Sequence, residues 1–310
     1  MFVKVLGSAA GGGLPQVNCS CRNCAAVRAG EPGLAARTQS SLAVSADGKA
    51  WALLNASPDL RQQLAATPDL APDPGKGPRS SPIEAVVLTN GDIDHIAGLL
   101  SLREGIRFTV YASGEVLAAL DANTVFNVLD RAVVARTALP AGAAVTLRNG
   151  DRELGLELEA FPVPGKVALY LEDAAAGPEF GTRAGDTLGL KVSDGASGAS
   201  FFFIPGCAAV DAALAARLRG AALVLFDGTL FTDDEMIAQG LSSKTGRRMG
   251  HIGMSGSDGS LAAFANLDVA RKVYTHINNS NPALREASPE RRTVEAAGWE
   301  IACDGMEIRL

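Results

Sequence analysis

Short apolar runs recur along the whole chain and constrain its fold more than any other feature. Runs of this length that are bounded by Gly, Pro and polar residues are typical of β-strands. We predict strands at Val3–Leu6, Ala50–Leu54, Ala85–Leu88, Phe108–Tyr111, Leu188–Val192, Phe201–Ile204, Leu223–Phe226 and Val273–His276.

Helix-like patterns lie between several of these runs, at Pro58–Ala66, Gly114–Leu120, Ala209–Arg219 and Asp233–Gln239. A last helix is expected after Ser288, which has the identity of an N-cap residue, with Pro289 in its first turn and Gly298 just past its end. The Pro-rich segment 67–82 and the Gly/Ser-rich segment 194–200 are expected to be surface loops. Strands that alternate with helices indicate an α/β or layered α+β architecture.

Composition excludes some classes of partner. The chain has 310 residues, 47% of them hydrophobic, which is enough for one domain or for two closely fused halves. Its net charge of −6, without a Lys/Arg stripe, argues against a nucleic-acid partner. No apolar run approaches the roughly 20 residues of a membrane span, and the start of the chain turns Gly-rich before a signal-type apolar core develops. We therefore expect a cytoplasmic protein without a membrane contact; a homodimer stays open.

The segment 18–24 places Cys19, Cys21 and Cys24 in a C-x-C-x2-C pattern. Three thiols at this spacing can surround one soft cation, which predicts a structural Zn²⁺ with a distant fourth ligand. Gly11–Gly13 is interpreted as a tight turn that leads into this loop. The isolated Cys207 and Cys303 are expected to be small core residues.

The chain contains three histidines, each in a different context. His95 ends a loop with Asp92 and Asp94 just beyond a predicted strand, and this arrangement favours a ligand pair. His276 ends another predicted strand, whereas His251 lies in a Gly-rich segment.

These motifs resemble those of metallo-β-lactamase-fold proteins, which carry an H-x-H-x-D-H loop after a strand. Asn90–His95 is similar to that loop, with Asp94 and His95 at its last two ligands and Asn90 and Asp92 in place of the first two. His276 resembles the final ligand of the family, and His251 resembles a proton-donating histidine of its phosphodiesterase and tRNA-processing branch. The resemblance implies an αββα sandwich, in which two β-sheets are flanked by helices.

A narrower resemblance, to the coenzyme PQQ synthesis protein B (PqqB) family, covers essentially the whole chain. It rests on motifs in one order, at Leu6–Gln16 running into the Cys pattern, Asn55–Asp59, Asp94–Glu104, Phe226–Thr229 and His276–Pro282. It implies a single domain over residues 1–310 and a role in making pyrroloquinoline quinone (PQQ). The expected reaction is iron- and O2-dependent hydroxylation of the tyrosine ring in the Glu-Tyr precursor derived from PqqA. The family has also been described as aiding transport of PQQ or its precursor to the periplasm.

The resemblance also suggests ligands. In related phosphodiesterases the fourth zinc ligand lies three residues after the final histidine, a position held here by Asn279. A dinuclear hydrolytic site is not expected, because the first two motif histidines are replaced and Pro205-Gly206-Cys207 stands where the bridging carboxylate would lie. The remaining Asp94, His95 and His276 give the ligand count of a mononuclear Fe²⁺ site.

Further residues are expected around that centre. Asp92 or Asp227 could add a ligand, and we expect His251 and Asp227 to act in the pocket without being primary ligands. Asp59 and Asn90 are expected beside the substrate or behind the metal ligands. Three interpretations stay open at this point: an iron hydroxylase, a residual hydrolase, and a non-catalytic carrier of PQQ or its precursor.

Overall fold

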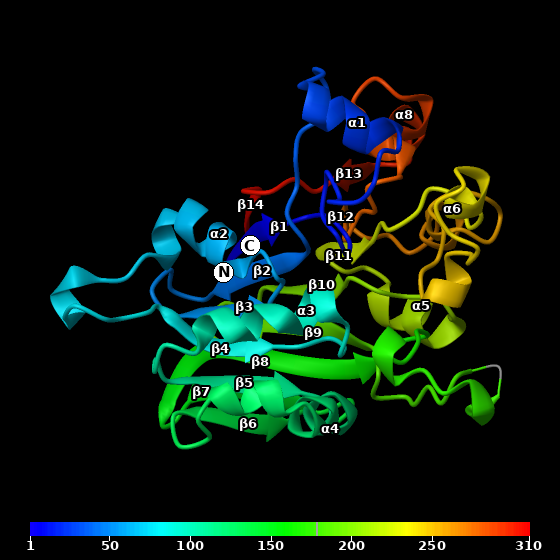
Figure 1. The fold of residues 1–310 in the computed structure, drawn as a ribbon. Coiled ribbons are helices and arrows are strands. Elements are labelled where there is room, and N and C mark those ends of the chain that lie inside the picture. The colour runs from blue at the N-terminus through cyan, green and yellow to red at the C-terminus, as the bar shows by residue number, and fades with distance from the viewer. Residues whose placement is uncertain (178) are drawn as a thin grey trace.

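In the computed structural model, which describes residues 1–177 and 179–310, the predicted strands join two mixed sheets. Across those described residues each sheet has seven strands, in the orders β14-β1-β2-β3-β4-β5-β6 and β13-β12-β11-β10-β9-β8-β7 (Figure 1). The strands of the first sheet are β1 (Phe2–Gly7), β2 (Ser41–Ser45), β3 (Trp51–Leu54), β4 (Ile83–Val87), β5 (Phe108–Ala112), β6 (Val134–Ala138) and β14 (Glu307–Arg309). Those of the second are β7 (Ala144–Asn149), β8 (Arg152–Pro162), β9 (Leu188–Asp194), β10 (Ser200–Ile204), β11 (Leu223–Asp227), β12 (Arg271–Thr275) and β13 (Trp299–Ile301).

Both sheets change from antiparallel to parallel pairing partway across. In the first sheet the change comes at β3, which pairs antiparallel with β2 and parallel with β4. In the second it comes at β10, which pairs antiparallel with β9 and parallel with β11. The inner parallel strands β4 and β11 are almost wholly buried apolar runs, which is why the sequence identifies them readily.

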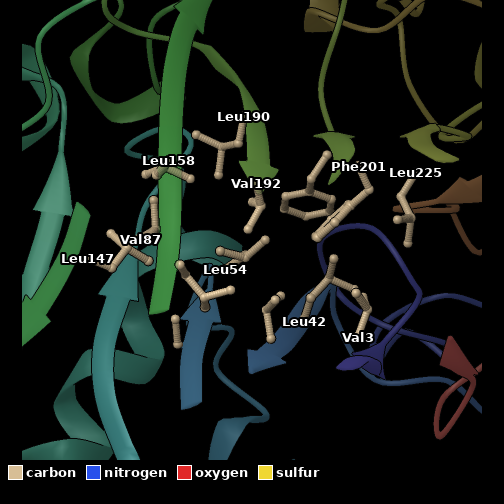
Figure 2. Close-up of a cluster of buried hydrophobic side chains, with 14 of the residues drawn as sticks. Val3, Leu42, Leu54, Val87, Leu147, Leu158, Leu190, Val192, Phe201 and Leu225 are labelled. Atoms are coloured by element: carbon tan, nitrogen blue, oxygen red, sulfur yellow. The ribbon is translucent and has the colours of Figure 1, made fainter. Parts of the chain in front are cut away.

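The main core lies between the two sheets. Val3, Leu42, Leu54 and Val87 of the first sheet meet Leu158, Leu190, Val192, Phe201 and Leu225 of the second, and all of them are buried (Figure 2). Burial of this apolar surface from both sides is the main force that holds the sheets together.

Helices cover the outer face of each sheet (Figure 1). Leu60, Ile96 and Val116, from α2 (Leu60–Ala66), α3 (Ile93–Ile96) and α4 (Gly114–Ala122), pack in the apolar cluster outside the first sheet. On the second sheet the outer cluster receives side chains from α1 (Arg22–Ala29), α5 (Ala212–Leu218) and α8 (Pro289–Ala296). The short helices α6 (Glu235–Ala238) and α7 (Ser260–Ala263) lie in the long connection between β11 and β12. This layering confirms the predicted αββα sandwich.

The helix boundaries follow the local sequence signals. Ser288 Oγ accepts a hydrogen bond from Arg291 N at 2.9 Å, which confirms the predicted N-cap of α8. The segment 67–82 is a connection with two short 3-10 helices, and 194–200 joins β9 to β10. Among the described residues, no helix is both long and apolar enough to cross a membrane.

One expectation about the core is wrong. Cys207 is fully buried as predicted, but Cys303 is exposed. It follows the last residues of β13 and begins the turn to β14, in which Gly305 has a φ of 82°. A turn between two strands projects its side chains into solvent, so the small size of Cys303 gave a misleading signal.

Candidate metal centres and the cavity between them

Polar side chains gather beyond the carboxyl ends of parallel strands from both sheets. The segment after β4 carries His95, β11 ends at Asp227, and His276 directly follows β12. Crevices at this end of parallel strands are the usual ligand sites of open α/β sheets. A cavity of about 460 Å³ lies here, and Asp94, His251 and His276 are part of its lining.

Asp94, His95 and His276 form the first candidate metal centre. One ligand atom of each lies within 4.8 Å of those of the other two. His276 Nε2 is 3.0 Å from Asp94 Oδ2, and His95 Nε2 is 3.8 Å from the same oxygen. Burial would raise the pKa of Asp94, but the two imidazoles lower it well below its usual range. The carboxylate is therefore ionised, as a metal ligand must be.

The His95 ring is held from behind by a hydrogen-bond chain. Its Nδ1 lies 3.3 Å from Thr89 Oγ1, and Asn55 Nδ2 donates to that hydroxyl at 3.0 Å. Burial lowers the pKa of His95 to about 4, although Asp94 acts in the opposite direction, so the ring is neutral at pH 7. Within the described residues the buried Nε2 has no hydrogen-bond partner. A neutral nitrogen without a partner, 3.8 Å from the cavity-lining carboxylate of Asp94, is suited to a metal.

The His276 ring is held by Thr229. Thr229 Oγ1 lies 2.9 Å from His276 Nδ1, which leaves Nε2 directed to Asp94. Burial disfavours protonation of His276, yet the hydrogen bond and charge of Asp94 outweigh it, so its pKa is raised. His276 also has a φ of 54°, an uncommon conformation for a residue other than glycine.

Fully buried Asp227 and partly exposed His251 form a second pair beside this centre. His251 Nδ1 is 2.7 Å from Asp227 Oδ2, and that oxygen also accepts from Cys207 N at 2.9 Å. The other oxygen, Oδ1, accepts from Thr229 N at 3.0 Å and lies 2.7 Å from Thr229 Oγ1. Asp227, His251 and His276 also have ligand atoms within 4.8 Å of one another. Because both oxygens of Asp227 are already occupied, its geometry fits a group that orients His251 better than a metal ligand.

The three N-terminal cysteines form the second candidate metal centre, at the start of α1. The side-chain amide nitrogen of Asn279 donates to the sulfurs of Cys19, Cys21 and Cys24 at 3.2, 3.4 and 3.3 Å. Burial would raise the pKa of Cys21, but hydrogen bonds from neighbours, first from the Cys24 backbone, lower it overall. Burial raises the pKa of Cys24 to about 11. Asn279, which lies 255 residues after Cys24 in the chain, is therefore brought into contact with all three cysteine sulfurs.

Three predicted residues lie outside both centres. The carboxylate of Asp92 lines the cavity but is 3.5 Å from Lys166 Nζ, and it belongs to no group of converging ligand atoms among the described residues. Asn90 also lines the cavity and accepts from Asp92 N at 2.9 Å. Asp59 does not line it; its carboxylate accepts from Gln39 N at 2.9 Å, and Gln39 in turn accepts from Gly12 N at 3.1 Å. Asp59 therefore supports the turn at Gly11–Gly13 from behind.

Sequence reasoning missed several residues that the structure brings to the site. Thr229 contacts Asp227, His251 and His276 through one hydroxyl. The cavity is also lined by the charged side chains of Lys166, Glu172, Lys244 and Arg248. The Asp-Gly-Thr sequence after a buried strand was a usable signal for Thr229, whereas the four charged residues lie in loops whose positions no local pattern reveals.

Comparisons with known proteins agree with this geometry. A model of the beta-lactamase superfamily domain matches residues 50–277. Coenzyme PQQ synthesis protein B of Bradyrhizobium diazoefficiens is 55% identical over 311 residues, covering 99% of each chain. The protein of the same name from Rhodopseudomonas palustris strain BisB5 is 53% identical and covers 100% of both chains.

Solved structures give the same result. The crystal structure of Zn²⁺-bound PqqB from Methylobacterium extorquens superposes with a TM-score of 0.94 at 49% identity and covers 100% of both chains. A diphosphatase of the PhnP family superposes with a TM-score of 0.66 at 21% identity, which is evidence for the shared fold alone. Identity near one half over the full length and the superfamily match together show that the chain belongs to the coenzyme PQQ synthesis protein B family of the beta-lactamase superfamily.

Proposed function

We propose that the chain acts in PQQ biosynthesis as a metal-dependent enzyme that hydroxylates, with iron and dioxygen, the tyrosine ring of the Glu-Tyr precursor derived from PqqA. The observation that carries the proposal is the convergence of Asp94, His95 and His276 within 4.8 Å at the wall of a cavity. The names of relatives up to 55% identical support the pathway. The reaction and the precursor are those that the family resemblance implies, and oxygen uptake with that precursor tests both.

The residues present fit a mononuclear iron site. Two imidazoles and one carboxylate, with the remaining positions open to a cavity, form the ligand set that non-haem Fe²⁺ oxygenases use. The orphaned Nε2 of His95 would gain its missing partner. Iron bound here would supply the activation of dioxygen that ring hydroxylation needs.

The remaining residues would orient the substrate and handle its proton. His251 contacts Asp227 through Nδ1, so Nε2 is the ring nitrogen left for a ligand. An imidazole held by a carboxylate in this way can accept the proton of a phenolic hydroxyl. Gly11 fits the same picture, because a Cβ there would come 3.4 Å from Asp94 Oδ2 and narrow the access to the centre.

For the cysteine centre we propose a structural Zn²⁺ with Cys19, Cys21, Cys24 and the side chain of Asn279 as ligands. The two ends of an amide have nearly the same shape, so a half-turn of the Asn279 amide would bring its oxygen to the point where its nitrogen now meets the three sulfurs. The solved relative that is described as Zn²⁺-bound supports the choice of metal.

A carrier of PQQ or its precursor is the second candidate, because a cavity of about 460 Å³ is large enough to hold such a molecule. A hydrolase is less well supported. Two-metal hydrolysis needs ligands for a second ion. Here Asp92 is paired with Lys166, and both oxygens of Asp227 are taken by hydrogen bonds.

The test loads protein that retains Zn²⁺ at the cysteine centre with Fe²⁺ under anaerobic conditions and then adds dioxygen, ascorbate and the Glu-Tyr precursor. We expect oxygen uptake and a precursor that has gained oxygen. The His251→Ala variant should bind iron normally and react about 100-fold more slowly, since general-base assistance contributes about that much. Unchanged iron binding by a folded Asp94→Asn variant would contradict the proposed metal centre and favour the carrier function.

A further inference from the structure

Three cationic side chains line the cavity beside the Asp94–His276 centre, whereas Asp92 and Glu172 are the two acidic residues of the lining outside the proposed metal ligands. Lys166, Lys244 and Arg248 line it, from the loop after β8 and the loop between α6 and β12. All three lower the pKa of Glu172, Arg248 most strongly through a hydrogen bond and the two lysines through their charge. The three cations therefore lie around a single carboxylate on this wall.

Two of the three cations already have partners. Arg248 donates to both oxygens of Glu172, at 3.1 and 2.8 Å, and its guanidinium stacks on the Phe180 ring at 3.7 Å. Such a bidentate pair is fixed in place and largely satisfied. Lys166 Nζ is 3.5 Å from Asp92 Oδ1 and donates to its neighbour's carbonyl, Val167 O, at 3.2 Å. It retains donor capacity, because an ammonium has three protons to donate.

Lys244 is the third cation, and it differs from the other two in its partners. It is half-buried, and within residues 1–177 and 179–310 it forms no ion pair. Its loop is held firmly nonetheless: Lys244 N donates to Ser242 Oγ at 3.1 Å, and Gly246 N donates to Asp233 O at 2.8 Å. Glu172 is the carboxylate on which the Lys244 charge acts, but both of its oxygens accept hydrogen bonds from Arg248. A half-buried ammonium on a fixed loop, with its own donors not engaged in a direct ion pair, is suited to an anion that arrives with a ligand.

The remaining lining defines the rest of that ligand. Leu169, Met236 and Met249 contribute apolar surface to the same cavity. Methionine side chains adapt to flat aromatic rings and make favourable sulfur contacts with them. A ligand with an aromatic ring and an acidic group at its edge could contact both the apolar and the cationic side chains of the lining.

We propose that Lys244, together with Lys166, binds a carboxylate of the substrate and so selects aromatic polycarboxylic acids for this site. The proposal deepens the proposed function and rests on it for the site. PQQ carries carboxylates on an aromatic framework, and a cross-linked Glu-Tyr carries them on chains attached to its phenol ring. The two lysines would hold such a molecule by its acidic edge while the ring faces the metal ligands.

The test measures equilibrium binding of PQQ and of its fully esterified methyl ester to the purified chain. Loss of one charge-assisted hydrogen bond weakens binding about tenfold or more. We expect Lys244→Gln to weaken PQQ binding by that factor without changing ester binding, and Lys244→Arg to restore most of the loss. Lys49→Gln, at an exposed turn between β2 and β3, is the matched control and should bind both probes as the parent does.

Two outcomes would overturn the proposal. One is equal PQQ affinity in the parent and in both Lys244→Gln and Lys166→Gln; the other is a parent chain that binds the ester as tightly as the acid. Iron content and oxygen uptake are measured on the same samples. If hydroxylation fails in the parent while charge-dependent PQQ binding persists, the proposed reaction is wrong and the carboxylate site stands.

Discussion

The two candidate metal centres differ in how completely the protein surrounds them. At the cysteine centre three sulfurs and the Asn279 amide occupy the corners of one site. At the Asp94–His276 centre three protein groups converge on one side, and the other side faces a cavity. Closed coordination is typical of structural metals, and open coordination is typical of reactive ones. The comparison predicts stability effects at the first centre and chemical effects at the second.

One short segment serves both centres. His276 contributes to the open centre, and three residues later Asn279 reaches the cysteines. Asn278 N donates to Thr229 O at 3.0 Å, and Asn281 Nδ2 donates to Gly228 O at 3.0 Å, so the segment is fixed to the end of β11. Whether the centres act independently is therefore a question that substitutions on either side can answer.

The largest effect is expected from Cys21→Ser. The variant should lose zinc and about 3 kcal/mol or more of unfolding free energy, because loss of a structural metal is among the few severe single changes. Metal analysis and denaturant unfolding measure both quantities. Iron content at the open centre should persist. A variant that keeps its full zinc content would remove the cysteine assignment.

A substitution at the open centre should change iron binding and not zinc content, the reverse of the result expected for Cys21→Ser. His276→Ala should weaken iron binding by more than about 100-fold, since even residues behind a ligand contribute up to that factor. Zinc content should not change. Metal titration with the parent as reference measures both. Joint loss of zinc and iron would mean that the segment 276–279 couples the two centres.

Glu235 is buried beside the segment that joins the two centres, where it accepts a hydrogen bond from Ser280. Burial raises its pKa to about 7 from an ordinary value of 4.5, although Ser280 Oγ and Phe231 N donate to it at 2.6 and 2.7 Å. A carboxyl with a raised folded-state pKa binds more protons when folded, so unfolding free energy falls as pH rises from about 4.5 to about 7. Glu235→Gln should remove this decline and be more stable above pH 7 by on the order of 2 kcal/mol.

Unfolding curves at several pH values provide the measurement for Glu235. Glu157→Gln, on the exposed face of β8, is the control and should follow the parent. The comparison is made as the difference between parent and Glu235→Gln, because the lowered pKa of His95 makes the stability of both chains rise with pH over much of the same window. A difference that stays constant between pH 4.5 and 7 would show that Glu235 is ionised in the folded protein.

The smallest effect is expected at Thr229, whose hydroxyl contacts both histidines. Thr229→Val keeps the shape and removes the hydroxyl, so iron affinity should fall about tenfold, the lower end for a residue that orients a ligand. Thr229→Ser should bind iron as the parent does. Equal affinities in the two variants would show that packing alone orients His276.

The sequence predicted the buried strands well, because an apolar run such as Leu223–Phe226 has few alternatives to a place in a sheet. Among the described residues it missed the fully buried β2, the mostly exposed β6, and also β7, β8, β13 and β14. The alternating burial of Arg152–Pro162 shows that a period of two was available there as a signal.

At the site, the structure brings Asp94, His95 and His276 within 4.8 Å of one another, and their role as metal ligands stays a prediction. The sequence could not reveal that Asp92 pairs with Lys166 or that Asp59 stays behind Gln39, since both depend on where distant loops lie. Lys244 was missed for the same reason. Whether a lysine forms an ion pair can be decided only when the positions of the surrounding carboxylates are known.

The left-handed backbone at His276 has a consequence for how this family can change. Asn55, which supports His95 through Thr89, has the same kind of conformation with a φ of 63°. Each non-glycine residue held this way costs on the order of 1 kcal/mol, which glycine would largely avoid. Glycine at 276 would remove this cost together with the imidazole. Glycine at 55 would also leave the backbone N–H of Thr89 without the Asn55 oxygen to which it donates at 2.9 Å. His276 is a proposed metal ligand and Asn55 supports His95, so attempts to make the chain more heat-resistant should leave both positions untouched.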